Sequence, residues 1–204
     1  MKENLKLGGI LLTITVIAGL LLGFANDLTK EAILENSKVS KEDLSIILPV
    51  ASSIKETEGV TPNESVNEIY DALDASGNKV GNVFKVTTKG FHGPVELVIA
   101  ISSDDKVSGM RVLAHSETPG LGAKIEEDKF TSKIKDLPIE EDIEMVKVTP
   151  SKDNEVEGVS GASVSSKAVG TAINDSVRFY KGNIKGEEVA PKEEVDTKVS
   201  WLLR

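Results

Sequence analysis

"VELVIAISSDDKVSGMRVLAH", residues 95–115, contains two apolar runs separated by the short polar stretch 103–106. In both runs apolar residues recur near every second position, which is the spacing of a strand with one buried face. Two such runs on either side of a short turn are typical of an antiparallel β-hairpin. We expect the first run, 95–101, to be the central strand of a sheet.

The patterns on both sides of this hairpin extend the same fold. Residues 66–73, 80–88 and 143–149 predict further strands, with Gly, Asn and Asp in the turns. Segment 52–65 is expected to be a loop, 128–137 a short helix, and 28–48 one or two short helices that end before Pro49. From Ser165 onward a three- and four-residue spacing predicts a helix of about four turns; its apolar positions are Val169, Ala172, Ile173, Val177 and Tyr180. The expected fold class is therefore α+β, a small antiparallel-sheet domain with flanking helices.

The amino terminus carries an uncharged, apolar run at residues 7–25. A run of about 19 residues can span a hydrocarbon core as a helix. Lys2 and Lys6 precede the run and Asp27 follows it, so the positive-inside rule predicts a cytoplasmic amino terminus and an extracytoplasmic domain. A signal peptide cleaved near residues 23–25 is the alternative, although its apolar region is usually shorter. We expect a retained single-pass anchor in the cell membrane.

Four parts of the chain follow from these patterns. Residues 1–26 are the expected transmembrane anchor, and 27–64 a membrane-proximal helical and loop segment. Residues 65–184 are the expected folded domain. Residues 185–204 are mostly charged and offer little to bury, so we expect a flexible tail.

The composition of the 204-residue chain excludes several classes of function. The formal net charge of −9 argues against nucleic acid as a partner. The absence of cysteine excludes disulfides, thiolate metal sites, iron–sulfur clusters and c-type haem. His92 and His115 are the only histidines, so a multi-histidine metal centre within this chain is not expected. Any redox cofactor must therefore be organic.

The stretch "GVSGASVSSKAV", residues 158–169, places four serines where the last predicted helix begins. Nucleophile-elbow and P-loop patterns both fail here, because Ala162 occupies the place of the second elbow glycine and no G-x-x-x-x-G-K-[ST] occurs. Ser103 and Lys106 match S-x-x-K by spacing only, in a predicted turn. Two interpretations remain open from the residues alone: helix capping, and anion binding at the helix start, where Gly161 permits a close backbone approach.

The segment "SGASVSSKAV" is similar to the flavin-attachment sequence of the FMN-binding domain family, which is typically S/T-G-A-T. A second segment, "HSETPGLGAKI" at 115–125, resembles the flavin-pocket loop of the same family. Both motifs occur in the expected order. The single anchor resembles the family's membrane-bound branch, the G-type subunits of Rnf ion-translocating electron-transport complexes and the related C-type subunits of Na⁺-translocating NADH:quinone reductases. Ser163 stands where threonine is usual and Glu157 where aspartate is usual; serine presents the same oxygen nucleophile without the methyl group.

The resemblance implies that Ser163 carries FMN through a phosphoester installed by a flavin transferase, which uses FAD and Mg²⁺. The flavin would do the redox chemistry, so no residue is expected to be catalytic or to bind a metal. Leu121 would contact the ring and Thr118 would donate a hydrogen bond. For His115 and Lys124, structural and cofactor roles both stay open. The predicted cofactor-binding residues are Ser160, Gly161, Ala162, Ser163, Val164, Ser165, His115, Glu117, Thr118, Gly120, Leu121, Gly122 and Lys124.

The function implied by the resemblance is that of an extracytoplasmic electron carrier. Its partners would be the integral membrane and cytoplasmic subunits of an Rnf-type ferredoxin:NAD⁺ oxidoreductase coupled to Na⁺ or H⁺ transport. Two alternatives stay open: a binding or structural module without a cofactor, and a stand-alone extracellular flavin reductase.

Overall fold

The computed structural model describes residues 2–36 and 39–189. The chain divides into two compact units, one that contains helix α1 (Lys2–Asn36) and one that begins at Lys41. Within α1, the segment Lys6–Lys30 contains an 18-residue window with a mean hydropathy of 2.3. At about 1.5 Å per residue, this segment is longer than a hydrocarbon core is thick. The predicted apolar helix is therefore present, and it continues beyond the apolar run to Asn36.

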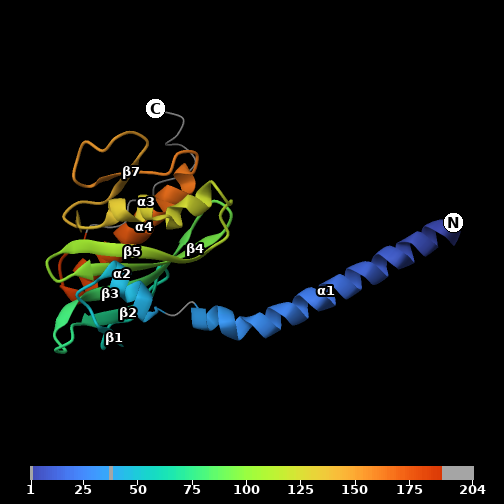
Figure 1. Ribbon diagram of the computed structural model, residues 1–204, viewed down its shortest axis with the longest axis horizontal. Coiled ribbons are helices and arrows are strands. Elements are labelled where there is room, and N and C mark those ends of the chain that lie inside the picture. Colours follow the sequence, from blue (N-terminus) through green and yellow to red (C-terminus); the bar gives the residue numbers. More distant parts are fainter. Residues whose placement is uncertain (1, 37–38, 190–204) are drawn as a thin grey trace. The chain divides into compact units, whose positions relative to one another are not determined.

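A six-stranded antiparallel sheet forms the centre of the second unit, with the strands in chain order from β1 to β6 (Figure 1). The predicted hairpin and the two strands before it are confirmed, and the strand at 94–102 lies inside the sheet as expected. One difference is β1, in a segment expected to be a loop; it pairs with residues 70–73, and its polar sequence SIKE carries no alternating apolar signal. The strands are β1 (Ser53–Glu56), β2 (Val66–Leu73), β3 (Lys79–Lys89), β4 (Pro94–Ser102), β5 (Lys106–His115) and β6 (Leu137–Pro138).

Helix α4 (Ser163–Phe179) covers one face of this sheet. Its buried positions include the predicted Val169, Ala172, Ile173 and Val177, and Tyr180 follows in a π-helical turn, η3 (Tyr180–Ile184). Phe84 of β3 has its ring centroid 6.2 Å from that of Phe179, in an edge-to-face arrangement. Alternate residues of β3 and β4 thus enclose one hydrophobic core with the helix.

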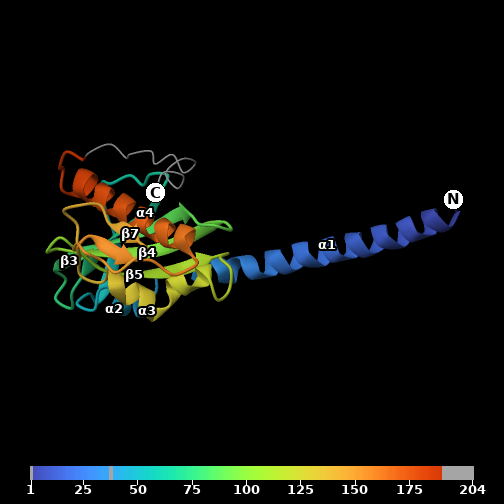
Figure 2. The ribbon, with the colours of Figure 1, turned by 90° about the horizontal axis from the view of Figure 1, so that it is seen from above.

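Helix α2 (Lys41–Ile47) packs against β5, and Figure 2 shows it on the side of the sheet opposite to α4. Gly109 allows this close approach, because a Cβ at that position would lie 3.0 Å from both Cα and O of Ile47. Asp43 also forms an ion pair with Arg111 at 3.0 Å. The segment that leads out of α1 is therefore fixed to the sheet by packing and charge.

Short elements connect the sheet to α4. They are the 3₁₀ turn η1 (Gly122–Glu126), α3 (Asp128–Thr131), the 3₁₀ turn η2 (Ser132–Ile134), and the strands β7 (Glu144–Val146) and β8 (Glu155–Glu157). The short helix expected at 128–137 is thus divided between α3 and η2. The strand expected at 143–149 is shorter than predicted and pairs in parallel with β8 in a separate two-stranded sheet.

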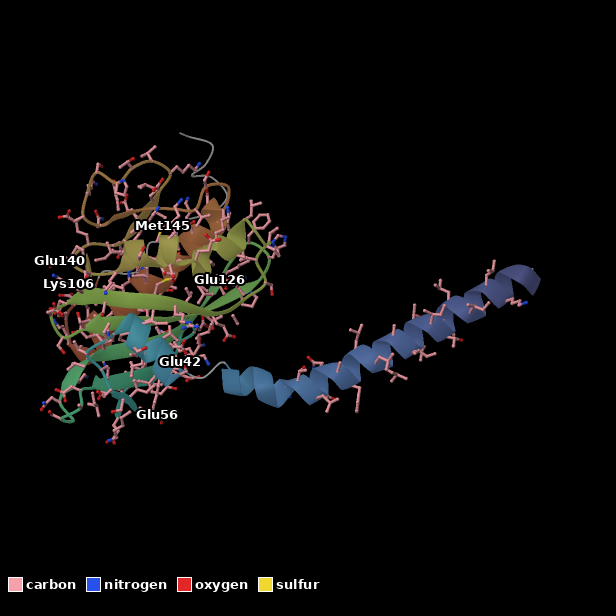
Figure 3. All side chains as sticks on the ribbon, viewed as in Figure 1. Glu42, Glu56, Lys106, Glu126, Glu140 and Met145 are labelled. Carbon is pink, nitrogen blue, oxygen red and sulfur yellow. The ribbon has the colours of Figure 1, made fainter. Side chains whose placement is uncertain are left out.

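Charged side chains cover the surface of the folded unit. Those labelled in Figure 3, Glu42, Glu56, Lys106, Glu126 and Glu140, are all exposed. Of the tail predicted at 185–204, residues 190–204 lie outside the described part of the chain.

Candidate flavin site

Helix α4 begins immediately after a tight turn. Gly161 adopts a φ of +80°, a left-handed conformation that favours glycine, and the amide of Ala162 donates to the carbonyl of Val159 at 3.0 Å. Ala162 is the N-cap residue, and no side chain forms a capping hydrogen bond there. The first amides of the helix, from Ser163 onward, have no carbonyl partner within the helix. This arrangement favours the anion-binding interpretation over simple capping.

The four serines occupy different environments. Ser160 and Ser163 are exposed, whereas Ser165 is 2% exposed and Ser166 is 1% exposed. The Ser166 hydroxyl accepts a hydrogen bond from the backbone amide of Val159 at 2.8 Å and donates one to the carbonyl of Ala162 at 3.0 Å. The structure therefore gives Ser166 a role in holding the turn and leaves the Ser163 oxygen accessible.

The loop at 115–122 lies directly against this helix start. A Cβ added to Gly122 would lie 2.8 Å from Oγ of Ser165, and one added to Gly161 would lie 3.4 Å from Cδ2 of Leu121. The two segments, which are distant in the chain, are therefore brought together as the sequence predicted. Leu121 and Val164 remain 48% and 49% exposed, and they provide apolar surface near the helix start.

Glu117 lies buried between the two segments, with 5% of its surface exposed. One carboxylate oxygen accepts hydrogen bonds from the backbone amides of Phe91, at 2.7 Å, and His92, at 3.1 Å. The other oxygen accepts a hydrogen bond from the Ser165 hydroxyl at 2.5 Å. Burial by itself raises the pKa of this carboxyl, but the Ser165 hydroxyl and the two amides outweigh that effect and lower the pKa below its ordinary value of 4.5. Glu117 is thus an ionised internal hydrogen-bond acceptor.

The remaining predicted residues have partners of their own. His115 accepts the Glu117 amide through Nδ1 at 3.1 Å, and its Nε2 lies 3.2 Å from a carboxylate oxygen of Glu126. His115 thus forms a structural hydrogen bond within the loop. Thr118 Oγ1 lies 3.2 Å from Nδ1 of His92. Gly120 is an exposed turn residue with a φ of +74°.

Two hollows flank residues 157–160, and lysines line both. The hollow that includes Ser160, Gly161 and Ser163 has a volume of about 260 Å³ and also contains Lys147 and Lys167. Lys124 lines the other hollow, of about 250 Å³, with Lys129 and Lys133. Lys124 therefore does not share the hollow of Ser163.

Sequence reasoning missed Lys147 and Lys167. Lys167 follows Ser163 by four residues, which places it one turn further on the same side of the helix. That spacing was a usable signal. Lys147 follows β7, which pairs with β8 and packs against α4, and these tertiary contacts bring it to the site.

The described residues fit a flavin phosphate. Backbone amides at the helix start and two lysine ammonium groups suit an anion, and the exposed Gly161, which has no side chain, permits close approach. Among residues 2–36 and 39–189, no cluster of His, Asp or Glu has the arrangement needed to hold a metal ion.

Both segments of the candidate site lie within a match to a known domain family. Residues 90–178 match the family model described as the FMN-binding domain. The chain is 33% identical to the G subunit of the ion-translocating oxidoreductase complex of Methanosarcina acetivorans, over 87% of this chain and 95% of that protein. It is 30% identical to the G subunit of the Na⁺-translocating ferredoxin:NAD⁺ oxidoreductase complex of Acetobacterium woodii, over 88% of this chain and 93% of that protein.

The fold is similar to the crystal structure of Shewanella oneidensis NqrC, with a TM-score of 0.51 and 19% identity, over 68% of this chain and 70% of that one. This likeness concerns the fold alone, whereas the relatives above match along nearly the whole sequence. The chain therefore belongs to the family of G subunits of ion-translocating oxidoreductase complexes and contains the FMN-binding domain.

Proposed function

We propose that this chain is an electron-carrying flavoprotein subunit of an ion-translocating oxidoreductase complex, with FMN bound through its phosphate to Ser163. The single observation that carries the proposal is the accessible Ser163 hydroxyl at an uncapped helix start, in a hollow shared with two lysines. Bound flavin would supply the one- and two-electron chemistry. The protein's part is to bind, orient and partly shield it.

The choice of Ser163 among the four hydroxyls rests on access and on hydrogen bonding. Ser165 and Ser166 are buried, and their oxygens are engaged by Glu117 and by backbone groups. Ser160 is exposed but lies in the turn before the helix begins. Ser163 is the first helical residue, so an ester phosphate on its oxygen would lie beside the free amides of the first turn.

Attachment would proceed by phosphoryl transfer from FAD on a flavin transferase with Mg²⁺. The Ser163 oxygen attacks the phosphorus on the riboflavin side of the diphosphate, and the bond from that phosphorus to the bridging oxygen breaks. AMP leaves, and the hydroxyl proton passes to a base of the transferase or to water. Lys147 and Lys167 would offset the negative charge of the resulting phosphodiester.

The residues of the 115–122 loop would contact the flavin beyond its phosphate. Leu121 and Val164, each about half exposed, would pack against the ring, and Thr118 would donate a hydrogen bond. Gly120 and Gly161 would keep the loop backbones close to the cofactor. The domain would extend over 65–184, with 27–64 joining it to the membrane.

The membrane topology and the partners follow from the same proposal. Helix α1 would anchor the chain with Lys2 and Lys6 in the cytoplasm and the flavin domain outside. A tethered cofactor would stay at high local concentration there instead of being diluted. The electron donors and acceptors would be membrane and cytoplasmic subunits of the complex, as the names of the relatives indicate that those proteins belong to such complexes.

The test is co-expression of the full chain with a flavin transferase, followed by a denaturing gel viewed under ultraviolet light. We expect a fluorescent band for the wild-type chain and for Ser160→Ala, and none for Ser163→Ala. Fluorescence that persists in Ser163→Ala would contradict the attachment site. A wild-type chain that holds no flavin, either covalently or after gentle purification, would contradict the function.

A further inference from the structure

We infer that Glu117 is a positioning residue, whose buried carboxylate fixes the 115–122 loop and the loop at 90–93 against the first turn of α4. The inference rests on the proposed function, because the geometry that it fixes is that of Ser163 and Leu121. It differs from the sequence expectation, in which Glu117 contacts the cofactor itself.

Three hydrogen-bond donors converge on the Glu117 carboxylate. Two of them, the amides of Phe91 and His92, belong to the connection between β3 and β4. The third, the Ser165 hydroxyl, belongs to the first turn of α4. Three segments that are distant in the chain therefore meet at a single side chain, and we call this set of contacts the Glu117 clamp.

Two glycines let the surrounding backbone pack closely against this carboxylate. A Cβ added to Gly90 would lie 2.4 Å from one Glu117 oxygen, and a Cβ added to Gly122 would lie 2.6 Å from the other. With 5% of its surface exposed, Glu117 has little direct access to solvent. Its oxygens are thus committed to protein donors and are not free to contact a ligand.

The Glu117 clamp lies next to the candidate flavin site. Ser165 is two residues from Ser163, and Leu121, which adjoins Gly122, approaches Gly161 in the turn before the helix. If the carboxylate is removed, the buried Ser165 hydroxyl and two partly buried backbone amides lose their acceptor. We therefore expect the loop to move away from α4, which displaces Leu121 from the flavin and alters the presentation of Ser163.

The experiment compares Glu117→Ala, Glu117→Gln and Ser165→Ala with the wild-type chain. The matched control is Glu127→Gln, an exposed carboxylate at the end of η1 that lies outside the Glu117 clamp. Each full chain in detergent is labelled by a flavin transferase at saturating FAD, and the rate is followed by intact mass. The flavinylated fraction is then titrated with iodide, which quenches flavin fluorescence according to the access of solvent to the ring.

Glu117→Ala should slow labelling by about ten- to hundredfold, the loss typical of a reacting group misplaced by about 1 Å. Its flavin should be quenched more strongly by iodide than that of the wild-type chain, at a temperature well below unfolding. Glu117→Gln keeps an oxygen acceptor for the two amides and an NH₂ that can face Ser165, so it should lie closer to wild type than to Glu117→Ala. Glu127→Gln should match wild type in both measurements.

Wild-type labelling and wild-type quenching in a folded Glu117→Ala chain would overturn the inference and leave the proposed function intact. If Glu117→Ala does not fold, Ser165→Ala decides, because it removes the helix side of the Glu117 clamp; wild-type quenching in that variant would overturn the inference. A wild-type chain that never accepts FMN would overturn the proposed function, and the inference with it.

Discussion

The hydrogen bonds of the buried Ser166 lead to a quantitative prediction for Ser166→Ala. The change removes the acceptor of the half-buried Val159 amide, at 2.8 Å, and the donor to the Ala162 carbonyl. Leaving such a donor without a partner costs about 1–3 kcal/mol. The better helix propensity of alanine offsets about 0.5 kcal/mol of this cost. We expect a net loss of about 0.5–2.5 kcal/mol in the free energy of unfolding.

At about 2–4 °C per kcal/mol for a domain of this size, the Tm of Ser166→Ala should fall by about 1–10 °C. The assay is thermal unfolding of the full chain in detergent, without flavin, followed by circular dichroism. The matched control is Ser163→Ala, which removes an exposed hydroxyl with no hydrogen bond to any other described residue and should change stability by less than about 0.5 kcal/mol. Equal Tm values for Ser166→Ala and the wild-type chain would refute the assignment of Ser166 to the turn.

Three further changes test other parts of the structure. Gly122→Ala should destabilise the chain by about 1–3 kcal/mol, because its Cβ would lie 2.6 Å from a carboxylate oxygen of Glu117; a Tm equal to wild type would contradict the close packing of this loop. Gly109→Val should loosen α2 from β5, seen as faster amide hydrogen exchange in residues 41–47, and unchanged exchange there would refute the contact with Ile47. The pKa of Glu117 is lower in the folded chain than in the unfolded chain. The ionised carboxylate therefore stabilises the fold at a pH above its pKa in the unfolded chain, and this stabilisation is lost as the pH falls through its pKa in the folded chain. Between about pH 5 and pH 3 the wild-type Tm should therefore fall more steeply than that of Glu117→Gln, and parallel profiles would contradict the Glu117 clamp.

Elements with a regular apolar period were predictable from the sequence. The hairpin at 95–115 was recognisable because both of its strands place apolar residues in the hydrophobic core, and α4 itself buries a stripe at three- and four-residue spacing. The strand β1 was missed because it is a short, polar edge strand whose pairing depends on β2. The pairing of β7 with β8 was missed because runs of three residues carry too little periodicity.

The candidate site was predictable only in part, and for a similar reason. The segments 115–122 and 158–166 could be recognised by their motifs, and the structure brings them together. The contributions of Lys147 and of the Phe91 amide depend on loops whose positions are set by tertiary contacts. The four serine hydroxyls look alike in the sequence. In the folded chain two of them are buried and hydrogen-bonded, whereas Ser163 is accessible.

Peptide mapping of the flavinylated chain by tandem mass spectrometry tests the central proposal most directly. The chain would be co-expressed with the flavin transferase, digested, and sequenced through the fluorescent peptide. We predict one FMN phosphoester per chain, on the oxygen of Ser163. FMN on Ser160, Ser165 or Ser166, or a peptide 158–169 that stays unmodified under conditions in which a control substrate is fully labelled, would contradict it.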